Sequence, residues 1–255
     1  MSAGALSADE LERYSRQLVL PQWSARAQLA LRGAGVLVIG LGALGSPVAA
    51  YLAAAGVGRL GLVDDDEVEL SNLARQPLHY TPDLGVSKAH SAAAKLRFLN
   101  PEVSAEPYPA RLDESNADAL VGGQDLVVDC SDSFQTRYVV NGACCRAGVP
   151  LVEGGVLGLA GLVLSVAPGA SACYRCAFPQ PPPAASVPSC AQAGVLGPVA
   201  GVIGALQATE AVKALAGLPG RLLDVLLQVD LEDYTVTRVA LRRREDCPDC
   251  GRATL

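Results

Sequence analysis

The sequence predicts an α/β protein whose mostly parallel, doubly wound sheet carries antiparallel additions. Over the first 150 residues, short apolar runs such as 36–40 and 125–130 alternate with segments of helical character. Hydrophobic residues make up 50% of the chain but aromatic residues only 4%, so we expect the aliphatic core of a sheet that is buried on both faces. From residue 149 onward, β-rich runs separated by Gly and Pro indicate antiparallel strands. The 255 residues fit a single domain, 1–255.

Two helices are expected before the first strand. Ser7 and Glu10 fit a capping box, which marks the start of a helix that carries Arg13 and Arg16. Their spacing alone fits a solvated basic face of the helix as well as it fits a functional role for these two arginines. A second short helix is expected over 23–32.

The first strand runs directly into a glycine turn. Gly40, Gly42 and Gly45 stand at the positions of a G-x-G-x-x-G fingerprint that includes Ala43, and a helix is expected over 44–55. In such a fingerprint the first Gly permits a tight turn, the second lets the backbone approach a phosphate, and the third lets helix and strand pack closely. The helix N-terminus would direct free N–H groups at an anion. This order predicts a Rossmann-like nucleotide site; the alternative is a turn packed only for structure.

An acid and several cations follow the second strand. Asp64 ends the run 59–64, where a carboxylate can accept hydrogen bonds from ribose hydroxyls. Asn72, Arg75 and Lys88 come shortly afterwards. A dinucleotide needs few cations here because the helix N-terminus already binds its pyrophosphate, whereas a triphosphate carries more charge that Arg and Lys can hold. The segment therefore favours a nucleoside triphosphate over a nicotinamide or flavin dinucleotide.

A further acid follows the strand expected at 125–130. Asp132 would lie at the carboxyl edge of the sheet, where open parallel sheets bind ligands, beside the glycine turn. A carboxylate next to a triphosphate is most useful if it holds Mg²⁺. Asp132 or Ser133 could also cap the helix expected over 134–147, and one loop can serve both roles.

Four of the eight cysteines form two C-x-x-C pairs. Four thiolates make a closed tetrahedral zinc site, which would tie the C-terminal segment to the body of the protein. Redox-active pairs are the main alternative, but those open a helix in a thioredoxin-like unit that the sequence does not contain. The predicted zinc ligands are Cys173, Cys176, Cys247 and Cys250.

The segment between the two cysteine pairs is rich in proline. Five prolines fall between 179 and 188, which indicates a mobile extended loop. The loop ends at Cys190, shortly before a helix expected over 195–215, and a helix N-terminus lowers the pKa of a nearby thiol. An incidental loop cysteine is the alternative interpretation.

Charge and hydropathy argue against two classes of partner. The net charge of -6, the pI near 5.0 and the lack of a basic stripe argue against nucleic acid. The helix expected over 195–215 has the length of a membrane span, but Gln207, Glu210 and Lys213 favour buried packing instead. The N-terminus lacks the pattern of a signal peptide, so we expect a cytoplasmic protein without membrane association.

Six separated motifs resemble those of the MoeB/ThiF/HesA family, bacterial relatives of ubiquitin-activating enzymes. The motifs are RYSRQ at 13–17, GLGALG at 40–45, DDDEVELSNLARQ at 64–76, CSDS at 130–133, CYRC at 173–176 and CPDC at 247–250. The resemblance covers nearly the whole chain. It departs from the family pattern at Ala43, where Gly is common, and at Ser133, where Asn usually stands.

The resemblance implies ATP, Mg²⁺ and Zn²⁺ as cofactors. Asp64 would bind the ribose and Asp132 the magnesium ion, while Asn72, Arg75 and Lys88 would hold the phosphates. Arg16 would enter the ATP site of the other subunit of a homodimer, and Cys190 would form a thioester or persulfide-type link with the carrier. The expected catalytic residues are Arg16, Arg75, Lys88, Asp132 and Cys190. The expected nucleotide contacts are Gly40, Gly42, Ala43, Gly45, Asp64, Ser71, Asn72, Arg75, Lys88, Asp132 and Ser133.

The activity that the resemblance implies is ATP-dependent adenylation of the C-terminal glycine of a ubiquitin-like sulfur carrier, with release of pyrophosphate. Residues 1–150 would bind the nucleotide, and 151–255 would hold the zinc and the carrier's Gly-Gly end. The carrier would be a molybdopterin-synthase small subunit or a thiamine-pathway protein. Because the chain ends five residues after Cys250, without a rhodanese domain, a separate protein would donate the sulfur. A non-catalytic carrier-binding scaffold and an NAD- or FAD-dependent oxidoreductase remain as alternatives.

Overall fold

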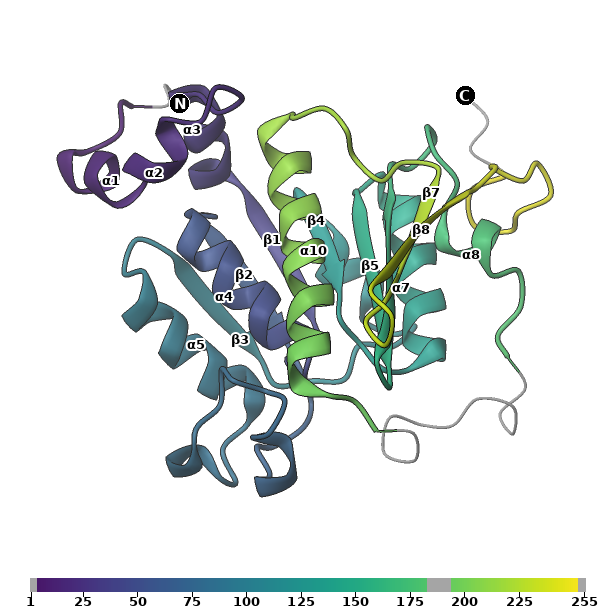
Figure 1. The fold of residues 1–255 in the computed structure, drawn as a ribbon, viewed down its shortest axis with the longest axis horizontal. Coiled ribbons are helices and arrows are strands. Elements are labelled where there is room, and N and C mark those ends of the chain that lie inside the picture. Colours follow the sequence, from purple (N-terminus) through teal and green to yellow (C-terminus); the bar gives the residue numbers. More distant parts are fainter. Residues whose placement is uncertain (1–3, 183–193, 252–255) are drawn as a thin grey trace.

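The computed structural model describes residues 4–182 and 194–251, and its centre is an eight-stranded sheet (Figure 1). In chain order the strands are β1 (Gly35–Ile39), β2 (Arg59–Val63), β3 (Ser104–Tyr108), β4 (Leu126–Asp129), β5 (Leu151–Leu157), β6 (Ala160–Val166), β7 (Val225–Asp230) and β8 (Thr235–Ala240). In space they follow the order β3-β2-β1-β4-β5-β6-β7-β8.

The sheet has a parallel part and an antiparallel part. Strands β1 to β5 pair in parallel, and β6, β7 and β8 are added antiparallel to β5. The chain leaves β1 toward β2 on one side and returns to β4 on the other, so the strand order reverses between β1 and β4. Open α/β sheets bind ligands at such a reversal, outside the carboxyl ends of the strands. The predicted fold class is confirmed.

Helices cover both faces of the sheet. The longer ones begin and end as follows: α3 (Ala25–Gly33), α4 (Gly45–Ala55), α5 (Lys88–Leu99), α7 (Phe134–Ala147) and α10 (Gly197–Ala216). One apolar cluster joins α3, α4, α5 and α10 to one face, and a second joins α6 (Ala117–Val121), α7 and α8 (Tyr174–Ala177) to the other. Two one-turn 3₁₀ helices, η1 (Leu70–Asn72) and η2 (Thr81–Asp83), lie between β2 and α5.

The N-terminal segment departs from the prediction of one continuous helix. The capping box of Ser7 and Glu10 is confirmed, but the helix is interrupted at Tyr14 into α1 (Ala8–Arg13) and α2 (Ser15–Leu18). Tyr14 is buried, and its hydroxyl accepts a hydrogen bond of 2.9 Å from Asn100 Nδ2. Because the Tyr14 ring must point into the body of the protein, tertiary packing overrides the local helical pattern here.

Helix α10 is long and apolar enough to cross a membrane by length and composition alone. It lies across the sheet beside α4 (Figure 1) and packs on α3, α4, β5 and β6. The side chains of Gln207 and Glu210 on this helix are buried and hydrogen-bonded within the protein. The helix is therefore packed as a core helix, as the sequence predicted.

The bond between Tyr14 and Asn100 gives a test of how the N-terminal helices are held. Asn100 is fully buried and also donates 2.8 Å to Ala53 O at the end of α4. Asn100→Ala should lower the free energy of unfolding by about 1–3 kcal/mol, because it removes two buried hydrogen bonds, to Ala53 O and to the Tyr14 hydroxyl, although Ala53 O keeps the bond from Gly56 N. Tyr14→Phe removes only one partner and should cost about 1 kcal/mol, as measured by urea denaturation.

The control for this comparison is Tyr51→Phe, which removes an exposed hydroxyl on α4. It should change stability by less than about 0.5 kcal/mol. Equal stabilities of the Asn100→Ala and Tyr51→Phe variants would contradict the assigned role of Asn100.

Candidate functional site

A cavity of about 1320 Å³ lies at the carboxyl ends of the parallel strands and continues along β5 to β8. It is larger than most small-molecule sites, which measure about 300–1,000 Å³. Nine of the predicted nucleotide contacts line it: Gly40, Gly42, Ala43, Asp64, Asn72, Arg75, Lys88, Asp132 and Ser133. The structure therefore brings together residues that are up to 93 positions apart in the chain, from 40 to 133.

The glycine turn is packed tightly against the segment that follows β4. Gly40 has φ +80°, and a Cβ there would lie 3.0 Å from Cys130 O and 3.1 Å from Ser131 N. A Cβ at Gly45 would overlap Gly40 O, so this glycine allows the close approach of α4 to the turn. A Cβ at Gly42 would meet Gln76 Nε2 at 3.5 Å, which is an ordinary contact distance, and Gly42 lines the cavity.

Two side chains, the partly buried Asp64 and the buried His79, fix the backbone of Leu41 within the turn. Asp64 Oδ2 accepts a hydrogen bond of 2.7 Å from Leu41 N, and His79 Nε2 lies 3.0 Å from Leu41 O. Because a carbonyl only accepts, His79 Nε2 must carry the hydrogen, and Nδ1 then faces Ser91 Oγ at 2.8 Å. Burial lowers the pKa of His79, which favours the neutral ring. His79 is thus a buried histidine whose two ring nitrogens both have hydrogen-bond partners.

Asp64 stands between the turn and the cationic side of the cavity. Burial raises the pKa of its carboxyl, while the hydrogen bond from Leu41 N and the nearby Lys88 charge oppose that rise. Its Oδ1 accepts 2.9 Å from Asp66 N. The carboxylate is therefore held by backbone donors at the edge of the cavity, where it can also meet a ligand hydroxyl.

The cations reach the cavity from the segment after β2 and from α5. Lys88 is buried, and its Nζ donates 2.7 Å to Asp66 Oδ2. Arg75 Nη1 donates 2.8 Å to Ser71 O, which leaves the other guanidinium nitrogens for a ligand. Arg111 also lines the cavity, although the sequence had not marked it. Three cations that line one cavity suit a polyanion.

Of the two candidates for the N-cap of α7, Asp132 and Ser133, the structure shows that Ser133 is the cap. Ser133 is the N-cap of α7, where its Oγ accepts 3.3 Å from Thr136 N. Asp132 is exposed and lines the cavity beside the glycine turn. Its carboxylate is therefore the one in this loop that can meet an ion or a ligand.

Four predicted site residues do not lie on the cavity wall that the structure describes. Arg16 is exposed on α2, Gly45 is buried under the turn, and Ser71 is exposed with its Oγ donating 3.3 Å to Glu69 Oε2. Cys190 falls outside the described residues 4–182 and 194–251. Its assignment, and that of Arg16, stay predictions.

Sequence reasoning had assigned no role to Arg137, which lines the floor of the cavity from α7. It lies in a buried charge cluster with Asp129 and Glu153, and its Nε is 3.3 Å from Glu153 Oε1. Burial raises the pKa of both carboxyls. The only signal in the sequence was the position of Arg137 on the first turn after the predicted cap.

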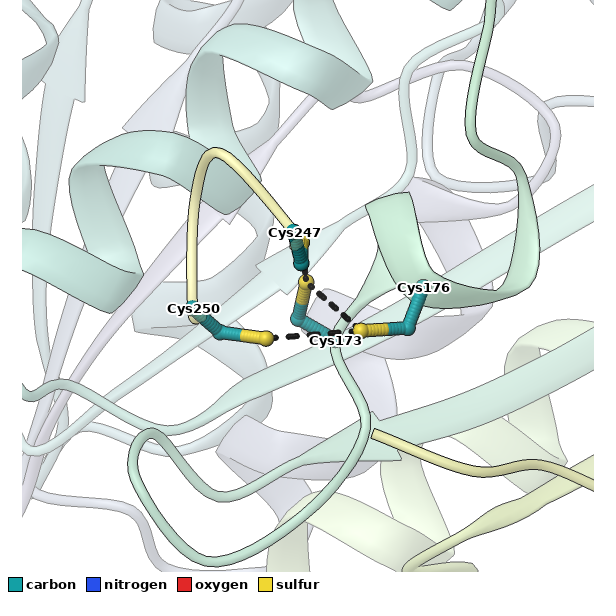
Figure 2. Close-up of side chains that lie close together, drawn as sticks. All are labelled: Cys173, Cys176, Cys247 and Cys250. Atoms are coloured by element: carbon teal, nitrogen blue, oxygen red, sulfur yellow. Dashed lines mark hydrogen bonds between the residues drawn. The ribbon is translucent and has the colours of Figure 1, made fainter. Parts of the chain in front are cut away.

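The four predicted zinc ligands converge in a second cluster, next to α8 (Figure 2). Their sulfur atoms all lie within 4.8 Å of one another. The Sγ–Sγ distances are 3.8 Å for Cys173–Cys176, 3.6 Å for Cys173–Cys247 and 3.4 Å for Cys176–Cys250. In a tetrahedral zinc site with Zn–S distances of about 2.3 Å, the four sulfur atoms lie about 3.8 Å apart. The arrangement therefore fits tetrahedral coordination of a zinc ion.

Polar contacts hold the two cysteine pairs together from α7. Asn141 Oδ1 accepts 2.9 Å from Tyr174 N beside the first pair, and Asn141 Nδ2 donates 2.6 Å to Asp249 within the second. Arg175 Nε forms an ion pair of 2.8 Å with the same Asp249 carboxylate. Hydrogen bonds and an ion pair therefore hold the segments that carry the four cysteines, as the outer shell of a metal site does.

Comparison with known proteins gives relatives over nearly the whole chain. "Adenylyltransferase and sulfurtransferase MOCS3" of Sus scrofa is 53% identical over 97% of this chain and 54% of its own length. "SAMP-activating enzyme E1" of Haloferax volcanii is 47% identical, covering 97% of this chain and 91% of the relative. "Sulfur carrier protein adenylyltransferase" of Thermus thermophilus is 46% identical, covering 95% and 92%. The chain thus spans about half the length of the MOCS3 relatives and most of the other two.

Solved structures share the fold. E. coli MccB in its complex with MccA-N7isoASN superposes with a TM-score of 0.86 at 23% identity, over 97% of this chain and 76% of MccB. The sequence pattern of the ThiF family matches residues 14–249, which include the cavity residues and three of the four clustered cysteines, all but Cys250. The chain belongs to the ThiF family.

Proposed function

We propose that the chain adenylates the C-terminal glycine carboxylate of a ubiquitin-like sulfur carrier, with ATP as the nucleotide and pyrophosphate as the released product. One observation carries the proposal: a single cavity extends from the glycine turn and its cations to the antiparallel strands. A nucleotide and the extended end of a protein substrate would thus share one space. The names of the relatives from Haloferax volcanii and Thermus thermophilus support this substrate class.

The nucleotide end of the cavity suits ATP. Asp64 would accept hydrogen bonds from the ribose, and the turn at Gly42 leaves room for a phosphate to approach the backbone. Lys88, Arg75 and Asn72 would hold the phosphate chain. The Lys88 ammonium forms an ion pair with Asp66 in the structure. A bound phosphate chain would therefore compete with Asp66 for this ammonium.

The proposed reaction needs no side chain as nucleophile. A carboxylate oxygen of the carrier attacks the α-phosphorus, the bond to the bridging oxygen of the β-phosphate breaks, and pyrophosphate leaves. Asp132 would hold Mg²⁺, and that ion would supply positive charge to the phosphate oxygens. The protein contributes position and fixed charge, as in other phosphate-transfer sites.

The carrier end of the cavity is lined by β5, β6 and β7. Its wall includes the small or apolar Val156, Ala160 and Leu162 and the polar Gln228. An extended Gly-Gly tail has no side chains, so it could reach the nucleotide along such a wall. A molybdopterin-synthase small subunit and a thiamine-pathway carrier both meet this requirement.

The proposal includes a homodimer in which Arg16 completes the site of the partner subunit. Arg16 is exposed on α2, next to the exposed apolar side chains of Val19 and Leu20. An exposed arginine beside apolar side chains could extend from a subunit interface into the nucleotide site of the neighbouring subunit. A separate sulfur donor, a cytoplasmic location and a covalent role of Cys190 complete the proposal.

The proposal predicts carrier-dependent ATP–pyrophosphate exchange. Exchange should require an intact carrier C-terminus, and Asp132→Asn should lower its rate about a hundredfold or more, because a fixed charge at the phosphates is lost. Asp118→Asn, which changes an exposed carboxylate on α6, is the matched control and should retain full exchange. Label exchange is counted with each candidate carrier, with and without its terminal glycine.

The outcome separates the enzyme from the alternatives. Tight carrier binding without exchange would instead establish a carrier-binding scaffold. A protein that neither binds a carrier nor exchanges pyrophosphate would overturn both.

The cysteine cluster predicts about one zinc ion per chain. Cys247→Ser should reduce the zinc content of freshly purified, reduced protein to near zero, because three thiolates bind the ion much more weakly than four. Cys144→Ala, at a buried cysteine of α7 outside the cluster, should keep its zinc. Metal content is measured by inductively coupled plasma spectrometry; a zinc-free wild-type chain would contradict the assignment.

A further inference from the structure

The backbone segment that leads from β4 to Asp132 is held from both faces of the sheet. Gln207 of α10 donates from Nε2 to Asp129 O at 2.8 Å. Arg137 of α7 donates from Nη2 to Ser131 O at 2.9 Å. Gln207 is fully buried and Arg137 is 8% exposed, although both are polar. Helices from opposite layers thus reach the same three-residue segment.

Strand β5 makes room for both side chains at two successive glycines. A Cβ at Gly154 would overlap the Gln207 carboxamide, and one at Gly155 would lie 2.8 Å from Arg137 Nη1. Successive residues of a strand point to opposite faces, which is why one glycine admits a side chain from α10 and the next admits one from α7. No other residue type would fit beside these two side chains without displacing them.

Buried carboxylates balance the charge of Arg137. Asp129 and Glu153 are neighbours in the register of β4 and β5, and both are fully buried. Glu153 forms the ion pair with Arg137, while Asp129 Oδ1 accepts 2.8 Å from Ser131 N. A buried guanidinium is stable only with such partners. The cluster therefore both fixes Arg137 and holds the segment directly.

The position of this segment matters to the site in two ways. Its Cys130–Ser131 peptide lies against Gly40, so it supports the glycine turn. The next residue is Asp132, whose side chain is exposed and lines the cavity. The location of that carboxylate is therefore set by the backbone behind it.

We propose that Arg137 and Gln207 are positioning residues, which hold segment 129–131 from the two faces of the sheet and so place Asp132 at the nucleotide phosphates. The inference rests on the proposed role of Asp132 as a magnesium ligand. Arg137 and Gln207 act through the backbone and need not touch the substrate. Their loss should weaken the contribution of magnesium to nucleotide binding more than the binding of the nucleoside.

The test compares three kinds of variant of the full-length chain. Gln207→Met keeps an unbranched side chain of similar length but cannot donate to Asp129 O. Arg137→Gln is combined with Glu153→Gln, so that the Arg137–Glu153 ion pair is removed as a unit, while Asp129 keeps its hydrogen bond from Ser131 N. The matched control is Glu210→Gln on the same helix, whose buried carboxylate is bonded to Ser165 Oγ and Leu222 N instead.

Calorimetry measures the binding of AMP, and of a non-hydrolysable ATP analogue with Mg²⁺ and with EDTA. We expect Gln207→Met and the Arg137→Gln/Glu153→Gln variant each to lose about tenfold or more of the magnesium-dependent gain in affinity. AMP affinity should stay within about twofold, because the turn and Asp64 remain. The Glu210→Gln protein should behave as the wild type in both respects.

Retention of the magnesium-dependent gain in either variant would overturn the assignment of that residue. An equal loss of AMP affinity would also overturn it, because that result indicates general disruption of the fold. Asp132→Asn is measured alongside: if this variant keeps the full magnesium-dependent gain, the proposed role of Asp132 fails. The two failures are thereby distinguished.

Discussion

The site depends on one close approach, between the glycine turn after β1 and the peptide that follows β4. A Cβ at Gly40, whose φ is +80°, would lie only 3.0–3.1 Å from that peptide, and Gly45 lets α4 begin directly beneath the turn. The two strands are neighbours in the sheet although they are separated by more than 80 residues in the chain. This contact puts a phosphate-binding turn and an acidic loop on one edge, which is the reversal point where open α/β sheets bind ligands.

Polar side chains, all buried except the partly buried Asp64, maintain this approach. His79 and Asp64 hold the two backbone groups of Leu41, and Gln207 and Arg137 hold the segment after β4. An unpaired buried carbonyl or amide costs about 1–3 kcal/mol, so each of these bonds stabilises one backbone position over its alternatives. A site built this way has its donors and acceptors in place before a ligand arrives, which reduces the cost of reorganisation.

Helix α7 connects the cavity with the cysteine cluster. Arg137, near the start of the helix, lines the cavity. Asn141, four residues later, forms hydrogen bonds with Tyr174 N and Asp249, which lie within the two cysteine pairs. Residues four apart share a face of a helix, so one stripe of α7 serves both sites. The cysteine cluster also joins the segment after β8, which carries Cys247 and Cys250, to α8, which carries Cys176.

Local sequence patterns were enough to predict the parallel sheet, the glycine turn, the acid that follows β2 and the four-cysteine cluster. Each of these is a local pattern of strand periodicity, turn chemistry or paired ligands, and local patterns can be interpreted without knowing the fold. Asp132 was also found this way, because it follows a strand whose carboxyl end must lie at the ligand edge.

The contacts of His79, Arg137 and Gln207 could be found only from the folded structure. Their partners lie 38, 6 and 78 positions away, and the two glycines of β5 that admit Arg137 and Gln207 carry no helix or turn signal of their own. The break at Tyr14 likewise came from its contact with Asn100 rather than from local preference. Such contacts depend on which elements pack together, and a pattern along the chain does not contain that information.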